Sequence, residues 1–158
     1  MIIDTSAIIA ILRDEPEAIS CARAIADATI RRISAVNFVE SAVVIDASRD
    51  PIATRRFDDF IREAGIAIDP VTTLQAQIAR DAYRDFGRGS GHPAKLNFGD
   101  CFAYALAKES GEPLLFKAVI SPTQTSLLFN KQCEAISVLV RSRIVRSSRP
   151  RLIRTDSV

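Results

Sequence analysis

Residue types that often define a functional site are scarce in this 158-residue chain. It has no tryptophan and one histidine, His92, and its three cysteines, Cys21, Cys101 and Cys133, form no CxxC pair. A lone histidine and scattered cysteines cannot complete a usual zinc set. Few cytosolic thiols are paired, so we expect these cysteines to be reduced.

Long apolar runs and several well-known motifs are also missing. No stretch approaches the ~20 apolar residues of a membrane helix, so no membrane association is expected. Asp4 and the lack of a basic segment before it exclude an ordinary signal peptide, and we expect a cytoplasmic protein. There is no P-loop, no GxGxxG after a strand and no GxSxG elbow, which disfavours nucleotide-binding and hydrolase folds built on them.

What the chain does have is a core and an uneven charge. An apolar content of 47% over this length is ample for one domain, with a core mostly of Ile, Leu, Val and Ala. Residues 118–158 hold seven basic and two acidic residues, whereas residues 1–117 hold fourteen and seventeen. The basic tail could contact RNA phosphates, although charge runs are usually only solvated.

Short apolar runs alternate with helical periodicities up to residue 117. The predicted strands span 1–3, 30–34, 66–71 and 113–117, and the predicted helices span 5–15, 15–28, 35–50, 53–65, 72–87 and 98–111. This alternation is typical of a parallel sheet covered by helices on both faces. No comparable pattern continues after residue 117.

Two helices carry more specific expectations. Thr5 or Ser6 is expected to cap the first helix, because a hydroxyl side chain can accept a free backbone N–H there. In the second helix, Ile19, Ala22 and Ala26 share one face and are expected to point toward the core.

Three carboxylates stand at chemically similar places, and the first is Asp4. It follows the first predicted strand, and open α/β sheets bind ligands beyond the carboxyl ends of their strands. Asp4 could equally serve only as the cap of the helix that follows.

Glu40 lies in the helix at 35–50, among Val36, Val43 and Val44 at helical spacing. This pattern places its carboxylate on an apolar face, where an unpaired charge is costly and a partner is expected. Asn37, one turn earlier, is placed to assist. Alternatively, Glu40 lies at the edge of this face and reaches water.

Asp100 opens the helix at 98–111, with Ala103 and Tyr104 on the same inward face. It could also be a first-turn acid that is stabilised by the helix dipole alone. Together, three carboxylates without His or Cys are the oxygen ligands that suit Mg²⁺, or Mn²⁺. Ions held in this way support in-line displacement at a phosphodiester.

Three stretches carry a family resemblance: MIIDTSAIIAIL (1–12), AVNFVES (35–41) and FGRGSGHPAKLNFGDCFAYALAKESGEPLLFK (86–117). Through them the chain resembles the PIN-domain ribonucleases, specifically the VapC toxins of bacterial VapBC toxin–antitoxin modules. The resemblance implies a three-layer α/β/α fold around a parallel sheet. It also implies an acidic metal site of Asp4, Glu40 and Asp100, with Thr5 or Ser6 as a polar accessory.

The implied activity is Mg²⁺-dependent endoribonuclease cleavage of a structured RNA of the tRNA or rRNA class. A VapB-like antitoxin would bind and block the site, and homodimers are usual in the family.

The resemblance stops after residue 117. Such toxins normally continue with GDDF or a similar stretch that supplies a fourth acidic ligand, but here residues 118–121 are Ala-Val-Ile-Ser. The family's closing edge strand is not recognisable either. We therefore expect a PIN-like core at 1–117 and an atypical Ser/Arg-rich segment at 118–158, and we hypothesise a shifted reading frame between them. Reduced nuclease activity is predicted, and the alternative is an inactive protein that binds antitoxin without cutting RNA.

Overall fold

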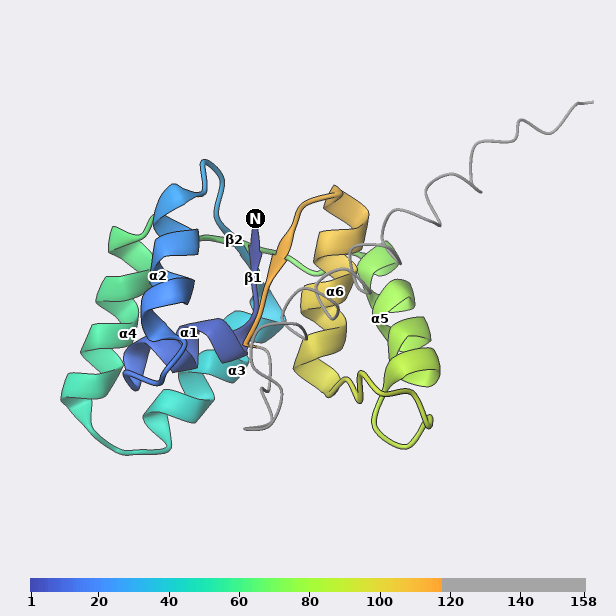
Figure 1. Cartoon of the computed structure of the whole chain (residues 1–158), viewed down its shortest axis with the longest axis horizontal. Coiled ribbons are helices and arrows are strands. Elements are labelled where there is room, and N and C mark those ends of the chain that lie inside the picture. The colour runs from blue at the N-terminus through green and yellow to red at the C-terminus, as the bar shows by residue number, and fades with distance from the viewer. Residues whose placement is uncertain (118–158) are drawn as a thin grey trace, which may run out of the picture. The chain divides into compact units, whose positions relative to one another are not determined.

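Residues 1–117 are the part of the chain that the computed structural model describes. Every predicted strand and helix overlaps an element of the same type (Figure 1). The elements are β1 (Ile2–Ile3), α1 (Thr5–Leu12), α2 (Ala18–Asp27), β2 (Arg32–Ser34), α3 (Ala35–Asp46), α4 (Pro51–Glu63), β3 (Ala67–Asp69), α5 (Thr73–Phe86), α6 (Phe98–Ser110) and β4 (Leu114–Leu115).

The strands form one parallel sheet in the order β3-β2-β1-β4. From β1 the chain moves outward to β2 and β3, and then returns to add β4 on the other side of β1. The direction of the connections therefore reverses between β1 and β4. In open α/β folds, the crevice beyond the carboxyl ends at such a reversal is where ligands bind.

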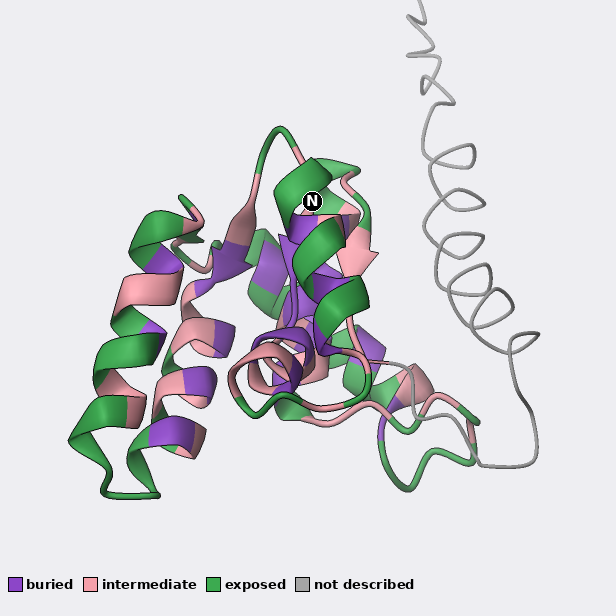
Figure 2. Cartoon of the chain, turned by 60° about the vertical axis from the view of Figure 1, so that its left-hand side comes forward, coloured by how far each residue is buried: buried purple, intermediate pink, exposed green. Residues whose placement is uncertain are grey.

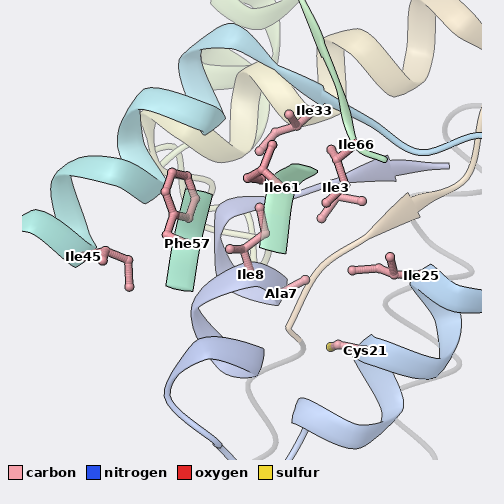
Figure 3. Close-up of a cluster of buried hydrophobic side chains, with 10 residues drawn as sticks. All are labelled: Ile3, Ala7, Ile8, Cys21, Ile25, Ile33, Ile45, Phe57, Ile61 and Ile66. Atoms are coloured by element: carbon pink, nitrogen blue, oxygen red, sulfur yellow. The ribbon is translucent and has the colours of Figure 1, made fainter. Parts of the chain in front are cut away.

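The central strand β1 buries both of its faces, because successive strand residues point to opposite sides of a sheet. Ile2 packs with Leu106, Ala107 and Leu114 on the side of α6. On the other side, Ile3 belongs to a larger cluster (Figure 3) of Ala7, Ile8, Cys21, Ile25, Ile33, Ile45, Phe57, Ile61 and Ile66. Buried residues gather in the middle of the sheet, in β1 and β2, and on the inward sides of the helices (Figure 2), which gives the predicted three-layer α/β/α arrangement.

The helix cap predicted at Thr5 or Ser6 is wrong, and the cap role considered for Asp4 is confirmed. Asp4, rather than Thr5 or Ser6, has the extended backbone of an N-cap, and its side chain accepts the backbone N–H of Ser6. A carboxylate is at least as good a cap as a hydroxyl, and the short strand β1 leaves Asp4 at the turn between strand and helix. The hydroxyls of Thr5 and Ser6 are thereby left for other partners.

The predicted inward face of the second helix is also wrong. Ile19 is 67% exposed, whereas Ala18, Cys21 and Ile25 are buried. Both sets have helical spacing, so periodicity alone does not choose between them. The packing of α2 beside α1 selects the face that carries Cys21 and Ile25.

Some predictions lie outside the described residues. The altered edge strand, the shifted frame and the basic tail all concern residues 118–158, and the division of the chain after residue 117 stays a prediction. No helix within residues 1–117 is both long and apolar enough to cross a bilayer.

Candidate active site

Asp4 lies at the carboxyl end of β1, at the reversal between β1 and β4. Its backbone N–H donates to the carbonyl of Leu115 at 2.9 Å, which fixes it beside the end of β4. Its side chain is only 3% exposed. Oδ2 accepts the backbone N–H of Ser6 at 2.8 Å and the Ser6 hydroxyl at 2.6 Å. Asp4 thus caps the helix and also carries a buried charge in the predicted ligand position.

Asn37, in the first turn of α3, connects the parts of the site. Its Nδ2 lies 3.2 Å from Asp4 Oδ1, 3.3 Å from Thr5 Oγ1 and 3.2 Å from the carbonyl of Gly99. These contacts join α1, α3 and α6 through one fully buried amide. Its Oδ1 is buried without a hydrogen-bond partner among the described residues.

Glu40 is half-buried and lies next to the same group of residues. Its Oε2 accepts the hydroxyl of Thr5 at 2.5 Å. The carboxylate lies against the Cα of Gly99, because a Cβ added to Gly99 would overlap it. Glu40 is therefore held between α1 and the start of α6.

The apolar face predicted for Glu40 is confirmed only in part. The buried residues of α3 are Asn37, Ser41 and Ile45, whereas Val43 is 62% exposed. Val43 is therefore not on the inward side of this helix, whereas Val36 and Val44 are half-buried, as Glu40 is. Of the buried residues of α3, Asn37 contacts the site, whereas Ser41 donates its hydroxyl to the Asn37 carbonyl within the helix.

Asp100 is held by a reciprocal cap at the start of α6. Its Oδ2 accepts the backbone N–H of Asn97 at 2.7 Å, while Asn97 Oδ1 accepts the N–H of Asp100 at 2.8 Å. The inward positions predicted for Ala103 and Tyr104 are confirmed, since both are buried.

Two residues at this end of the site escaped the sequence-based prediction. The spacing of Asn97 and Asp100 is that of a capping box, so Asn97 could have been found. Gly99, in contrast, gives no comparable signal.

The three carboxylates interact electrostatically. The pKa of Asp4 is raised to about 6, chiefly by burial; the hydrogen bonds from Ser6 act against this rise, and the nearby charges of Asp100 and Glu40 contribute to it. The fold therefore brings all three predicted acids to one end of the sheet, although they come from segments far apart in the sequence. Thr5, Ser6 and Asn37, predicted as accessory residues, each contact one of them.

The donor set fits a hard divalent ion in its chemistry, because it consists of carboxylate oxygens and one spare amide oxygen. As the side chains stand, however, no three His, Cys, Asp or Glu residues within 1–117 are arranged to hold one ion together. The role of the three acids as metal ligands stays a prediction.

Comparisons with known proteins agree with this geometry. The PIN domain family matches residues 1–118. A VapC ribonuclease from Mycobacterium bovis and ribonuclease VapC28 from Mycobacterium tuberculosis are each 58% identical to the chain over 117 residues, which cover 74% of it and 88% of each relative. Ribonuclease VapC from Mycolicibacterium smegmatis is 48% identical over 117 residues, covering 74% of the chain and 90% of its own length.

A solved structure is similar in fold. The crystal structure of Mycobacterium tuberculosis VapC20, a sarcin–ricin loop cleaving toxin, superposes with a TM-score of 0.57 and 13% identity. The similarity covers 75% of this chain and 89% of VapC20.

Proposed function

The chain belongs to the PIN-domain family and, within it, to the VapC ribonuclease toxins, and from this premise we propose that it is a Mg²⁺-dependent endoribonuclease. Asp4, Glu40 and Asp100 would hold the ion, with Mn²⁺ as a possible substitute. The observation that carries the proposal is the burial of Asp4 at the end of β1 with the other two acids close enough to raise its pKa.

The surrounding residues place the three acids. Ser6 and Asn37 fix the two oxygens of Asp4, Thr5 holds Glu40, and the cap with Asn97 orients Asp100. A divalent ion bound there would activate water and neutralise the leaving oxygen of a phosphodiester. It would also offset the repulsion among the carboxylates, which is a reason for such a charged cluster to persist at the edge of the core.

We propose further that activity is reduced, because Ala-Val-Ile-Ser occupies residues 118–121 where the family resemblance implies a fourth acidic ligand. Losing a ligand to the second ion of such a site is expected to slow cleavage by about 100-fold or more. If the tail arose from a shifted reading frame, one of the other two frames of the gene will encode a GDDF-like continuation. Its absence from both would refute that origin.

Cleavage of a structured RNA tests both proposals. We expect slow cleavage of a tRNA or rRNA fragment in Mg²⁺, none in EDTA, and none by Asp4→Asn. A variant with Gly-Asp-Asp-Phe at 118–121 should cleave about 100-fold faster. Cleavage that persists in EDTA or in Asp4→Asn would refute the metal mechanism. An unchanged rate in the restored variant would refute the explanation for reduced activity.

A second candidate function is antitoxin binding without catalysis. It is favoured by the lack of a ready-made three-carboxylate arrangement within residues 1–117. Co-purification with a VapB-like antitoxin, together with no cleavage even in the restored variant, would support it over the enzyme. A homodimer is also proposed from the family, and gel filtration of the full chain tests it.

A further inference from the structure

Lys117 connects three separate parts of the molecule near the candidate active site. Its backbone N–H donates to the Ser6 hydroxyl oxygen at 2.9 Å. Its side-chain Nζ donates to Glu15 Oε2 at 2.6 Å and lies 3.4 Å from Glu17 Oε2. Lys117 follows β4, whereas both glutamates lie in the connection between α1 and α2, so the ion pairs tie the end of the strand to that connection.

The two ion pairs are more sheltered than ordinary surface pairs. The side chains of Lys117, Glu15 and Glu17 are only 30%, 27% and 18% exposed. Glu17 Oε2 is buried and accepts no hydrogen bond within the described residues, so the nearby ammonium is the charge that compensates it. Sheltered pairs hold their geometry more firmly than exposed ones, which are often energetically neutral.

The backbone contact of Lys117 leads directly to Asp4. A hydroxyl group has one hydrogen, and Ser6 donates it to Asp4 Oδ2 at 2.6 Å. Because the Ser6 oxygen also accepts the N–H of Lys117, its hydrogen is kept directed at Asp4. The orientation of Asp4 thus depends on where the backbone after β4 is held.

We propose that Lys117 is a positioning residue for the acidic site. Its ion pairs with Glu15 and Glu17 hold the end of β4 where the Lys117 N–H directs Ser6 onto Asp4. The ammonium itself contacts neither ion nor RNA. This inference rests on the proposed role of Asp4 as a metal ligand.

The test compares Lys117→Met, Lys117→Arg and the control Lys108→Met, which changes another half-buried lysine, stacked over Tyr104 near the end of α6. Calorimetric titration of the metal-free full chain with Mn²⁺ gives the affinity. Outer partners of metal ligands typically contribute 10–100-fold, so Lys117→Met is expected to weaken binding by about tenfold. Lys117→Arg should retain most of the Mn²⁺ affinity of the unaltered chain, and Lys108→Met should leave that affinity unchanged.

The direction of the change separates positioning from simple charge. Removing a cation near an acidic site would by itself strengthen Mn²⁺ binding, so weaker binding requires a loss of geometry. If Lys117→Met destabilises the fold, Glu15→Gln combined with Glu17→Gln removes the same ion pairs. Because losing two negative charges would by itself weaken Mn²⁺ binding, this variant is judged by hydrogen exchange at Ser6, which should again be faster than in Lys108→Met. Binding by Lys117→Met that equals or exceeds that of the unaltered chain would overturn the inference.

Hydrogen exchange supplies a readout that needs no metal. In Lys117→Met, the amides of Ser6 and of residue 117 should exchange faster than in Lys108→Met, while those of α6 stay unchanged. Equal exchange at Ser6 would overturn the inference. If the unaltered chain binds no Mn²⁺ at all, the proposed function fails, and the exchange rates still decide whether Lys117 holds Ser6 in place.

Discussion

Replacing Gly99 by alanine is expected to disable the site while leaving the fold almost unchanged. Gly99 lies in the first turn of α6, and its Cα supports the Glu40 carboxylate. An added Cβ would come within 2.6 Å of Glu40 Oε1 and closer still to Oε2. The obstacle is the end of a flexible side chain, so Glu40 can move away and the backbone need not.

The expected free energies are small and partly cancel. Alanine is favoured over glycine in a helix by up to about 1 kcal/mol. Glu40 would lose the hydrogen bond from Thr5, and bonds to charged groups contribute about 1.5–3 kcal/mol. Because Glu40 is only half-buried, water replaces part of that bond. The net destabilisation should therefore stay below about 2 kcal/mol, a shift of a few degrees in Tm.

The effect on cleavage should be much larger. Displacing a reacting group by about 1 Å can reduce a rate about 100-fold, so at least this loss is expected for Gly99→Ala. The assays are RNA cleavage in Mg²⁺, Mn²⁺ titration and thermal melting in EDTA.

Gly111→Ala is the matched control. Gly111 has a φ of 70° and an added Cβ would meet no atom within 4 Å, so alanine there should cost about 1 kcal/mol of stability without affecting cleavage. Wild-type cleavage and Mn²⁺ binding by Gly99→Ala would refute the reasoning, as would a loss of activity explained by unfolding.

Two further predictions concern stability. Asp4 has a folded-state pKa of about 6 against an ordinary 3.8, so the metal-free protein should lose about 3 kcal/mol of stability as pH rises through this interval. Asp4→Asn cannot ionise, so urea unfolding of the two proteins in EDTA between pH 3.5 and 7 should show this dependence only in the unaltered chain; parallel curves would contradict it. Arg32 pairs with Asp69 and Glu112 at sites less than one-third exposed, so Arg32→Met should cost about 2 kcal/mol. Arg62→Met, which breaks a pair whose arginine is 68% exposed, should cost less than about 0.5 kcal/mol, and equal losses in the two variants would refute the distinction.

Local signals in the sequence were sufficient to predict the elements and the places of two acids. A short apolar run closed by Asp4 predicted a strand that ends in a turn, and this is confirmed. Asp100 was predicted at the opening of a helix, where it completes a cap with Asn97. In both cases the helix-capping contacts come from neighbours within three positions of the residue, which a single sequence displays.

Contacts between distant segments could not be predicted in the same way. Glu40 receives its hydrogen bond from Thr5, 35 residues earlier, and of the valines around it Val43 is exposed rather than inward. The inward face of α2 was ambiguous for the same reason, because two stripes had helical spacing. Which stripe is buried depends on the helices packed beside it, and the periodicity of one helix gives no information about those neighbours.

The double duty of Asp4 affects how an inactive form of this protein should be made. Shortening the residue to alanine would remove the anchor of α1, leave a gap beside Ser6 and Asn37, and abolish a buried charge, all in one step. If the alanine variant were not toxic, the cause could be either a loss of catalysis or a poorly formed α1. Asparagine keeps an acceptor for the Ser6 amide. With this replacement, a loss of toxicity in a growth test can therefore be attributed to the site.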